Sequence, residues 1–235
     1  MNFAKQLFFL FLYDIMKSVI VYKGCGGDFT VYIVLDFEFN QPYDFNNNKV
    51  GKVVGNCRFE IIQIGAVKLD ENFEIVGNFD ELIKPVIYKR IHPQVEKLTN
   101  ITDKMLRNKR KFPEVYADFR KFMGKDKEIV FGVWGGADME SLYRNLLFYK
   151  LCGEKMIFKY IDIQKLASKK LNYRNGAAIG LSTAVEMFDI KVNSPFHDAF
   201  CDADYTAKIL RLMKDDDINI KIYNTAQVIE KKAKI

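Results

Sequence analysis

The chain contains an apolar segment, residues 31–39, that is interrupted only by two acids, Asp36 and Glu38. Its β-branched and aromatic residues predict a buried strand. Side chains two residues apart on a strand point to the same face, so both carboxylates project together from apolar surroundings. Such carboxylates repel each other and lose hydration, which a divalent cation with oxygen ligands compensates. The alternative is a strand end where both acids reach water, the commoner setting for an isolated Asp-x-Glu.

A third acid follows a second short apolar segment, residues 130–134. Gly135 and Gly136 end this segment and permit a tight turn. Asp138 comes next and begins a predicted helix. It either caps that helix, as Asp often does, or lies beside the end of the first strand.

A histidine and a fourth acid, His197 and Asp202, lie five residues apart near the end of the chain. At about 100° per residue they would fall on different faces of one helix. We therefore expect His197 on the loop after Pro195 and Asp202 in the next helix, whose apolar residues recur at helical spacing. The alternative for His197 is a surface histidine beside a helix cap. The other histidine, His92, lies in an Ile-His-Pro turn.

In this order, the four acids and the histidine resemble the active-site motif of the DEDDh branch of the DnaQ-like 3′-to-5′ exonucleases. Residues 60–66 (EIIQIGA) are similar to the second strand of that family, and residues 98–102 (LTNIT) to its LTGIT turn. Asn100 replaces the usual glycine there, and Asn tolerates positive φ better than most residues. The WG..D segment that begins at Trp134 is most similar to the KapD and Eri-type exonucleases. The resemblance covers about residues 30–213.

The resemblance implies a metal-dependent nuclease with a ribonuclease H-like fold. Asp36, Glu38, Asp138 and Asp202 would hold two Mg²⁺ or Mn²⁺ ions, one activating a water and the other stabilising the leaving 3′-oxygen. His197 would accept the proton of the water as general base, a task that suits an imidazole near neutral pH. The enzyme would release nucleoside 5′-monophosphates from the 3′ ends of single-stranded RNA or DNA. The Eri-type likeness favours RNA.

Some residues near these motifs are candidates for substrate contact. Phe37 and Phe39 alternate with the two acids on the first strand, so core packing suits their side chains, while their backbone would border the terminal nucleotide. Trp134 either stacks on a base or packs in the core. By resemblance alone, the turn beside the 3′-terminal base is expected to contribute Leu98, Thr99 and Ile101.

The composition is that of a globular protein with a moderate basic excess. The 235 residues include 36 Lys and Arg against 30 Asp and Glu, a net charge of +6, which permits a polyanionic partner without specifying one. Basic clusters at residues 104–111 and 165–174 fit a solvated helix face as well as phosphate contact. The four cysteines are far apart and indicate neither a zinc site nor disulfides, so a cytoplasmic location is expected. Cys201 is expected to fill the core rather than bind a metal.

We expect one catalytic domain, residues 30–213, between two extensions. Residues 1–29 contain an apolar run too short to span a bilayer and are expected to form a non-targeting extension. Residues 214–235 are expected to form a short helix or a frayed polar tail. The predicted elements give an α/β fold, a ribonuclease H-like mixed β-sheet flanked by α-helices. The predicted strands are 31–39, 60–69, 74–83, 128–134 and 158–161, and the predicted helices start near Pro113 and Asp138 or span 162–171, 180–188 and 199–213.

Two classes of function remain. The chain is either an exonuclease or a non-catalytic module that binds nucleic acid or a regulatory protein, like an inhibitor of a sporulation pathway. A module without catalysis would be expected to lack at least one of the five motif residues, and none is missing, which favours the enzyme. A proofreading subunit of a polymerase would have the same chemistry and differ only in its partner. The sequence indicates no polymerase-binding domain, no membrane segment and no obligate protein partner.

Overall fold

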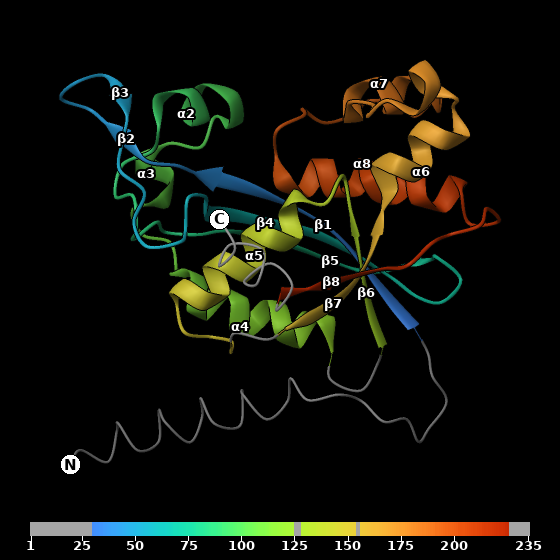
Figure 1. Ribbon diagram of the computed structural model, residues 1–235, viewed down its shortest axis with the longest axis horizontal. Helices are drawn as coiled ribbons and strands as arrows, with labels where there is room; N and C mark the ends of the chain where they lie inside the picture. The colour runs from blue at the N-terminus through green and yellow to red at the C-terminus, as the bar shows by residue number, and fades with distance from the viewer. Residues whose placement is uncertain (1–29, 125–127, 154–155, 226–235) are drawn as a thin grey trace, which may run out of the picture.

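The computed structural model describes residues 30–225, with gaps at 125–127 and 154–155. Its centre is a six-stranded sheet with the order β5-β4-β1-β6-β7-β8 (Figure 1). β1, β4 and β5 pair antiparallel, β6 and β7 continue the sheet parallel to β1, and β8 pairs antiparallel with β7. The bounds are β1 (Thr30–Asn40), β4 (Glu60–Leu69), β5 (Ile75–Leu82), β6 (Glu128–Val133), β7 (Ile157–Asp162) and β8 (Lys221–Asn224).

Helices cover both faces of this sheet (Figure 1). The alternation of side chains along β1 separates two hydrophobic cores, with Ile33 and Leu35 on the face of α4 and α5, and Val34 on the face of α6, α7 and α8. The predicted mixed sheet flanked by helices is therefore confirmed. The bounds are α4 (Phe112–Met123), α5 (Ala137–Phe148), α6 (Ile163–Lys170), α7 (Leu181–Met187) and α8 (Ala199–Leu212).

Several small elements were not predicted from the sequence. His92 is the N-cap of the helix α2 (Pro93–Thr99), where its Nδ1 accepts a hydrogen bond of 3.0 Å from the N–H of Gln94. Asn100 ends α2 with φ 59°, so the predicted turn with positive φ is confirmed. These elements are β2 (Tyr43–Asp44), β3 (Lys49–Val50), α2 (Pro93–Thr99), α3 (Asp103–Leu106) and a 3₁₀ turn (Tyr173–Gly176).

The prediction of a short helix or frayed tail after Met213 is wrong for residues 221–224. They form β8, whose pairing with β7 is extended by a hydrogen bond of 2.7 Å from the N–H of Met156 to Thr225 Oγ1. A four-residue edge strand is specified by the strand it pairs with rather than by its own composition. The predicted extension 1–29 and residues 226–235 lie outside the described residues.

Within the described part of the chain, no helix has the length and apolar character that crossing a membrane would require. Cys57, Cys152 and Cys201 are free thiols. Cys201 packs against the core under α6, α7 and α8, as expected for it.

Two buried polar side chains hold the loop after β5 against the sheet. The Glu60 carboxylate accepts hydrogen bonds of 2.6–2.9 Å from the N–H groups of residues 86–88. The Asn40 amide donates to the carbonyl oxygens of Tyr88 and Arg90 at 2.9 and 3.0 Å, and accepts from the N–H of His92 at 2.9 Å. Because Asn40 is the last residue of β1, this loop lies next to the end of the strand that carries Glu38.

Candidate functional site

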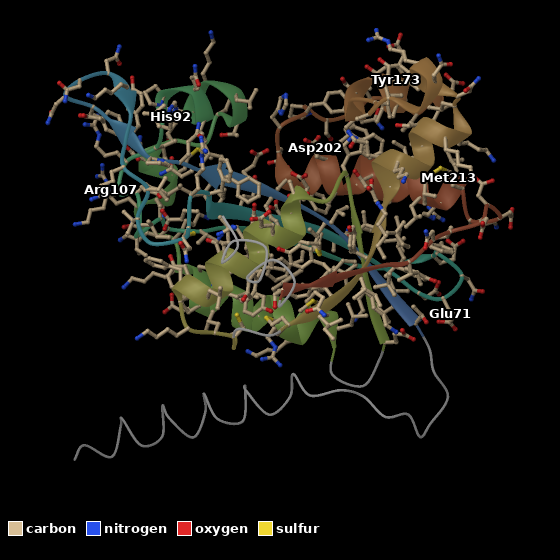
Figure 2. The ribbon with its side chains drawn as sticks, viewed as in Figure 1. Glu71, His92, Arg107, Tyr173, Asp202 and Met213 are labelled. Carbon is tan, nitrogen blue, oxygen red and sulfur yellow. The ribbon has the colours of Figure 1, made fainter. Side chains whose placement is uncertain are left out.

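Three of the predicted acids meet where α8 crosses the sheet. Asp36 and Glu38 leave β1 on the face that α8 covers, and Asp202 lies in the first turn of α8. One oxygen from each of these carboxylates lies within 4.8 Å of the other two. In Figure 2, Asp202 is labelled in the upper middle of the molecule, at α8. We call this group the carboxylate cluster.

Gly65 allows α8 to lie directly on the sheet. It pairs with Asp36 across β4 and β1, and a Cβ at this position would lie 2.1–2.3 Å from backbone atoms of Ala199 and Phe200. No side chain therefore fits between β4 and the first turn of α8. This close packing brings Asp202 down to the level of the two acids on β1.

Gln63 and Asp198 hold the same turn of α8, and neither was predicted from the sequence to be a site residue. Gln63 Nε2 donates to Asp198 Oδ2 at 3.0 Å, and Gln63 Oε1 accepts from the N–H of Ala199 at 3.2 Å. Asp198 also caps α8, because its Oδ1 accepts from the N–H groups of Phe200 and Cys201. For Gln63, the available signal was a polar side chain in the middle of the apolar residues 61–66.

Asp138 lies close to the cluster without joining it. It is 7% exposed in the first turn of α5, and Gly136 is the N-cap, so the capping alternative is wrong. Its oxygens are outside the group of three carboxylates. Its charge nevertheless raises the pKa of Asp36 more than any cause except burial does. Asp138 and Asp36 are therefore close enough to interact electrostatically.

Burial and mutual repulsion make the ionised form of these carboxyls costly. Burial raises the pKa of Glu38 to about 8, assisted by the charges of Asp202, Asp198 and Asp138. Burial alone raises the pKa of Asp138 to about 7, and the pKa of Asp36 is raised well above its ordinary range. A positive charge placed among these carboxyls would stabilise their ionised form.

The donor set fits a hard divalent cation. Oδ2 of Asp202 accepts a hydrogen bond of 3.1 Å from the N–H of His197, whereas Oδ1 is buried and has no hydrogen-bond partner among the described residues. A buried carboxylate oxygen without a partner is unfavourable. Coordination to Mg²⁺ or Mn²⁺, which prefer carboxylate oxygens, would satisfy it.

His197 lies on the loop before α8, and Asp202 lies within α8, as the sequence analysis predicted. His197 is exposed and has φ 65°, a region that His enters more readily than most residues. A positive charge on its imidazole would lower the pKa of Asp202, so the ring lies near the cluster. Among the described residues, none forms a hydrogen bond with the imidazole of His197.

The aromatic candidates for substrate contact have structural roles. Phe37 is 3% exposed and belongs to the core beneath α4 and α5, and half-buried Phe39 packs against Phe37 and Phe59. Core packing of both side chains is confirmed, while the expected contact of their backbone with a nucleotide stays a prediction. Trp134 is half-buried, packs against the core under α8 and donates from its indole nitrogen to the carbonyl of Ile179.

The residues of the LTNIT turn differ in exposure. Ile101 is 3% exposed in a small core with Ile62 and Ile91, so its side chain is not available to a substrate. The Thr99 hydroxyl donates to the carbonyl of Val95 and accepts from the N–H of Ile101. Leu98 is 53% exposed, so its side chain is accessible at the surface of this turn.

The fold and the acidic site define a class of nuclease. The structure is similar to the nuclease domain of 3′hExo, a DEDDh family member, bound to rAMP, with a TM-score of 0.65 and 21% identity over 83% of this chain and 96% of that one. It is also similar to the Mg²⁺- and Mn²⁺-bound form of S. pombe Pop2p, with a TM-score of 0.56 and 18% identity over 90% of this chain and 89% of that one. The predicted ribonuclease H-like fold is confirmed.

The family model described as Exonuclease matches residues 33–210, and the chain therefore belongs to the exonuclease family. The DNA polymerase III PolC-type of Thermotoga petrophila is 34% identical over 152 residues, 64% of this chain. The epsilon subunit of DNA polymerase III from Treponema pallidum is 44% identical over 63 residues, 27% of this chain and 28% of the subunit. The chain spans only 10% of the length of the PolC-type relative. The resemblance to DnaQ-like exonucleases is confirmed, and the narrower KapD and Eri-type likeness stays a prediction.

The raised pKa of Glu38 predicts how stability depends on pH in the absence of metal. Its carboxyl keeps a proton in the folded state up to about pH 8, whereas its ordinary pKa is 4.5. Its contribution to stability is therefore greatest below pH 4.5 and is lost as pH rises toward 8. We expect Glu38→Gln to raise the free energy of unfolding by ~1–3 kcal/mol in EDTA above pH 8, and by much less at pH 5.

Thermal unfolding at both pH values, with and without Mn²⁺, measures this effect. Glu71→Gln, an exposed change in the β4–β5 turn far from Asp202, is the matched control (Figure 2). Mn²⁺ should stabilise the wild type and the control at pH 8 and have less effect on Glu38→Gln. Equal stability of Glu38→Gln and wild type in EDTA at pH 8 would contradict the account of the cluster.

The close packing at Gly65 predicts that a substitution there lowers turnover by displacing Asp202, although no carboxylate is removed. Gly65→Ala should push the first turn of α8 away from the sheet and lower turnover by about 10²-fold, because a shift of about 1 Å is enough for such an effect. Gly180→Ala is the control, since a Cβ there would have its nearest neighbour at 3.9 Å. Circular dichroism and turnover are compared for both variants. A Gly65→Ala enzyme with wild-type turnover would show that this packing does not position Asp202.

Proposed function

We propose that this protein is a metal-dependent 3′-to-5′ exonuclease that removes nucleoside 5′-monophosphates from the 3′ ends of single-stranded nucleic acid, preferably RNA. The main support is the cluster of Asp36, Glu38 and Asp202, with the unpartnered Oδ1 of Asp202 turned into buried surroundings. Membership of the exonuclease family gives this cluster its chemical context.

Four acidic side chains would hold the metal. When bound, a pair of Mg²⁺ or Mn²⁺ ions supplies Lewis-acid activation of a water and neutralises charge at the scissile phosphate. Asp36, Glu38 and Asp202 are near enough together to share ligands, and Asp138 approaches Asp36. Gln63 and Asp198 orient the turn of α8 that carries Asp202, which sets the position of that carboxylate.

His197 is the proposed general base. Its imidazole is exposed and lies near Asp202, so it can accept the proton of the attacking water and pass it to solvent. The hydrogen bond from its own N–H to Asp202 Oδ2 ties the loop to the cluster. In this arrangement His197 lies beside the carboxylates without being a ligand of the metal.

Different relatives support RNA and DNA as the substrate. RNA is supported by structural neighbours of which one is bound to rAMP and another recognises a histone mRNA stem-loop. DNA is supported by the identity to PolC-type DNA polymerases. The same identity favours a second candidate function, proofreading of DNA in association with a polymerase. The non-catalytic module is the remaining alternative.

The proposal predicts a defined cleavage pattern. The purified protein should shorten 5′-labelled single-stranded RNA one nucleotide at a time from the 3′ end in Mg²⁺ or Mn²⁺, more slowly shorten matched DNA, and do neither in EDTA. Asp36→Asn should be inactive because it removes a carboxylate ligand while keeping nearly the same shape.

Gel analysis of the ladders, with Asp36→Asn as the control for contaminating nucleases, measures this activity. Faster cleavage of DNA than of RNA would favour the proofreading function. Absence of cleavage of either polymer in both metals would reject catalysis and leave the non-catalytic module.

The role of His197 predicts a different defect. His197→Ala should lower the rate by about 10²–10⁴-fold, the usual contribution of a positioned base, while stabilisation of the fold by Mn²⁺ remains. His92→Ala is a control for the removal of an imidazole elsewhere in the chain. Single-turnover cleavage and the thermal shift in Mn²⁺ are measured together. A wild-type rate in His197→Ala would remove His197 from the mechanism.

A further inference from the structure

The positive charge of the chain is concentrated at one end of the molecule. Residues 41–59 and 84–111 together contain twelve Lys and Arg residues but only three Asp and Glu residues, whereas the whole chain has 36 against 30. These segments form the β2–β3 hairpin, α2 and α3, which lie beside one another in Figure 1. The charge difference between this end and the remaining residues is therefore larger than the net charge of +6 suggests.

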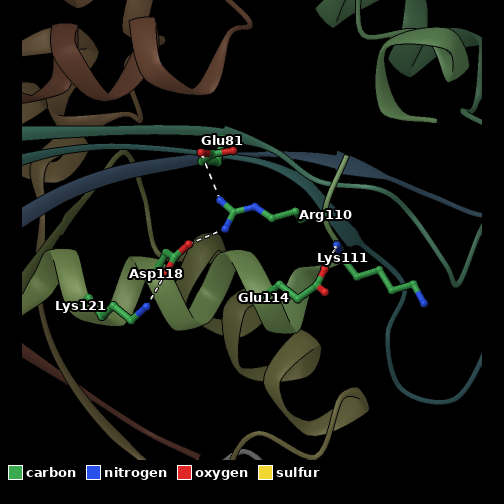
Figure 3. A network of polar contacts seen from close by, with 6 residues as sticks. All are labelled: Glu81, Arg110, Lys111, Glu114, Asp118 and Lys121. Atoms are coloured by element: carbon green, nitrogen blue, oxygen red, sulfur yellow. Dashed lines mark hydrogen bonds and ion pairs between the residues drawn. The ribbon is translucent and has the colours of Figure 1, made fainter. Parts of the chain in front are cut away.

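Part of this charge is used within the fold. Arg110 forms ion pairs with Glu81, at 3.2 Å, and with Asp118, and the N–H of Lys111 donates to Glu114 at the start of α4 (Figure 3). The cluster predicted at residues 104–111 is thus partly structural.

Nine other basic side chains at this end are exposed, and none forms an ion pair with another residue in the described part of the chain. Six of them lie in the hairpin and the loop after it, in the loop before α2, and at the C-cap of α3. We call these six residues the basic patch: Lys49, Lys52, Arg58, Lys89, Arg90 and Arg107.

The hairpin is fixed against the loop before α2 by packed rings. The guanidinium of Arg90 lies 3.8 Å from the ring centroid of Phe45, and the ring of Tyr43 packs edge-on against Phe45 and His92. The hydroxyl of Tyr88 donates to the carbonyl of Cys57 at 2.7 Å, which holds the residue before Arg58. The exposed charges of the patch are therefore carried by an ordered surface.

The patch begins next to the carboxylate cluster. Asn40 hydrogen-bonds the carbonyl of Arg90 and lies two residues after Glu38 on β1. Two residues of strand span about 6.6 Å, a distance comparable to one nucleotide step of an extended strand. In Figure 2, His92 and Arg107 lie on one side of Asp202, over α2 and α3. A nucleic acid strand whose 3′ end reaches the carboxylate cluster can leave the site along this surface.

We propose that the basic patch binds the phosphodiester backbone of the substrate strand on the 5′ side of the nucleotides at the cluster. The inference rests on the proposed exonuclease function and adds a second binding surface to it. A nucleic acid strand fits because it carries a regular row of negative charges and must continue outward from the site. Binding to phosphate does not depend on base sequence, so the patch would hold long strands of any sequence better than short ones.

The test compares two triple variants that remove the same charge. Lys49→Gln, Lys52→Gln and Lys89→Gln remove three exposed lysines of the patch, none of which touches the carboxylate cluster. The control carries Lys150→Gln, Lys191→Gln and Lys214→Gln, three exposed lysines outside it. Both sets are made in the Asp36→Asn background for binding and in the wild-type background for kinetics. Fluorescence anisotropy in EDTA measures the Kd of labelled RNA and DNA strands of about 4 and about 16 nucleotides, the range of typical single-strand sites.

The patch variant should bind the longer strand at least tenfold more weakly than the control in 0.1 M salt. The slope of log K against log salt should become shallower by about 0.7 for each phosphate that the variant no longer neutralises. In the active background, kcat/KM should fall on the long strand and remain unchanged on a dinucleotide. Equal Kd values and slopes for patch variant and control would overturn the inference, as would absence of binding of either strand by the parent protein.

These outcomes separate the inference from the proposed function. Binding is measured without turnover, so a protein that binds through the patch but cleaves nothing rejects the exonuclease proposal and retains the patch as a binding surface. If the wild type cleaves normally and the patch variant and the control have equal binding and kinetics, the exonuclease proposal is retained and the patch is rejected.

Discussion

The direct packing of the first turn of α8 on the backbone of β4 is the constraint on which the site depends. Gly65 leaves no atom between them, and the bonds of Gln63 and Asp198 keep the turn in place. A larger residue at position 65 would separate Asp202 from the acids of β1. The chemistry of the cluster is therefore set by a packing interaction in which none of the three carboxylates takes part.

The same interaction produces an unfavourable concentration of negative charge. Burial and neighbouring carboxylates raise the pKa of Glu38 to about 8, and Oδ1 of Asp202 has no partner in the described structure. Folding must compensate these costs through the two cores on either side of the sheet. Binding of a divalent cation would return part of this free energy, since a ligand that binds only the folded state stabilises it. The clustering of these carboxylates therefore lowers the stability of the metal-free protein and favours binding of a cation.

Strong local periodicity explains which parts of the fold were predictable. The alternation in β1 indicated that Asp36 and Glu38 share a face, and the five-residue spacing of His197 and Asp202 indicated a loop followed by a helix. The strand β8 and the β2–β3 hairpin have short, weakly patterned sequences, and their structure is specified by the elements they pair with or pack against. Gln63 and Asp198 carry no pattern of their own, because their role appears only when β4 meets α8.

X-ray diffraction from crystals grown with Mn²⁺, using the anomalous signal of manganese, would show whether the carboxylate cluster holds the metal. We predict anomalous peaks in contact with carboxylate oxygens of Asp36, Glu38 and Asp202, with Oδ1 of Asp202 among the ligands. Manganese located away from these oxygens, or no ordered manganese at saturating concentration, would contradict it.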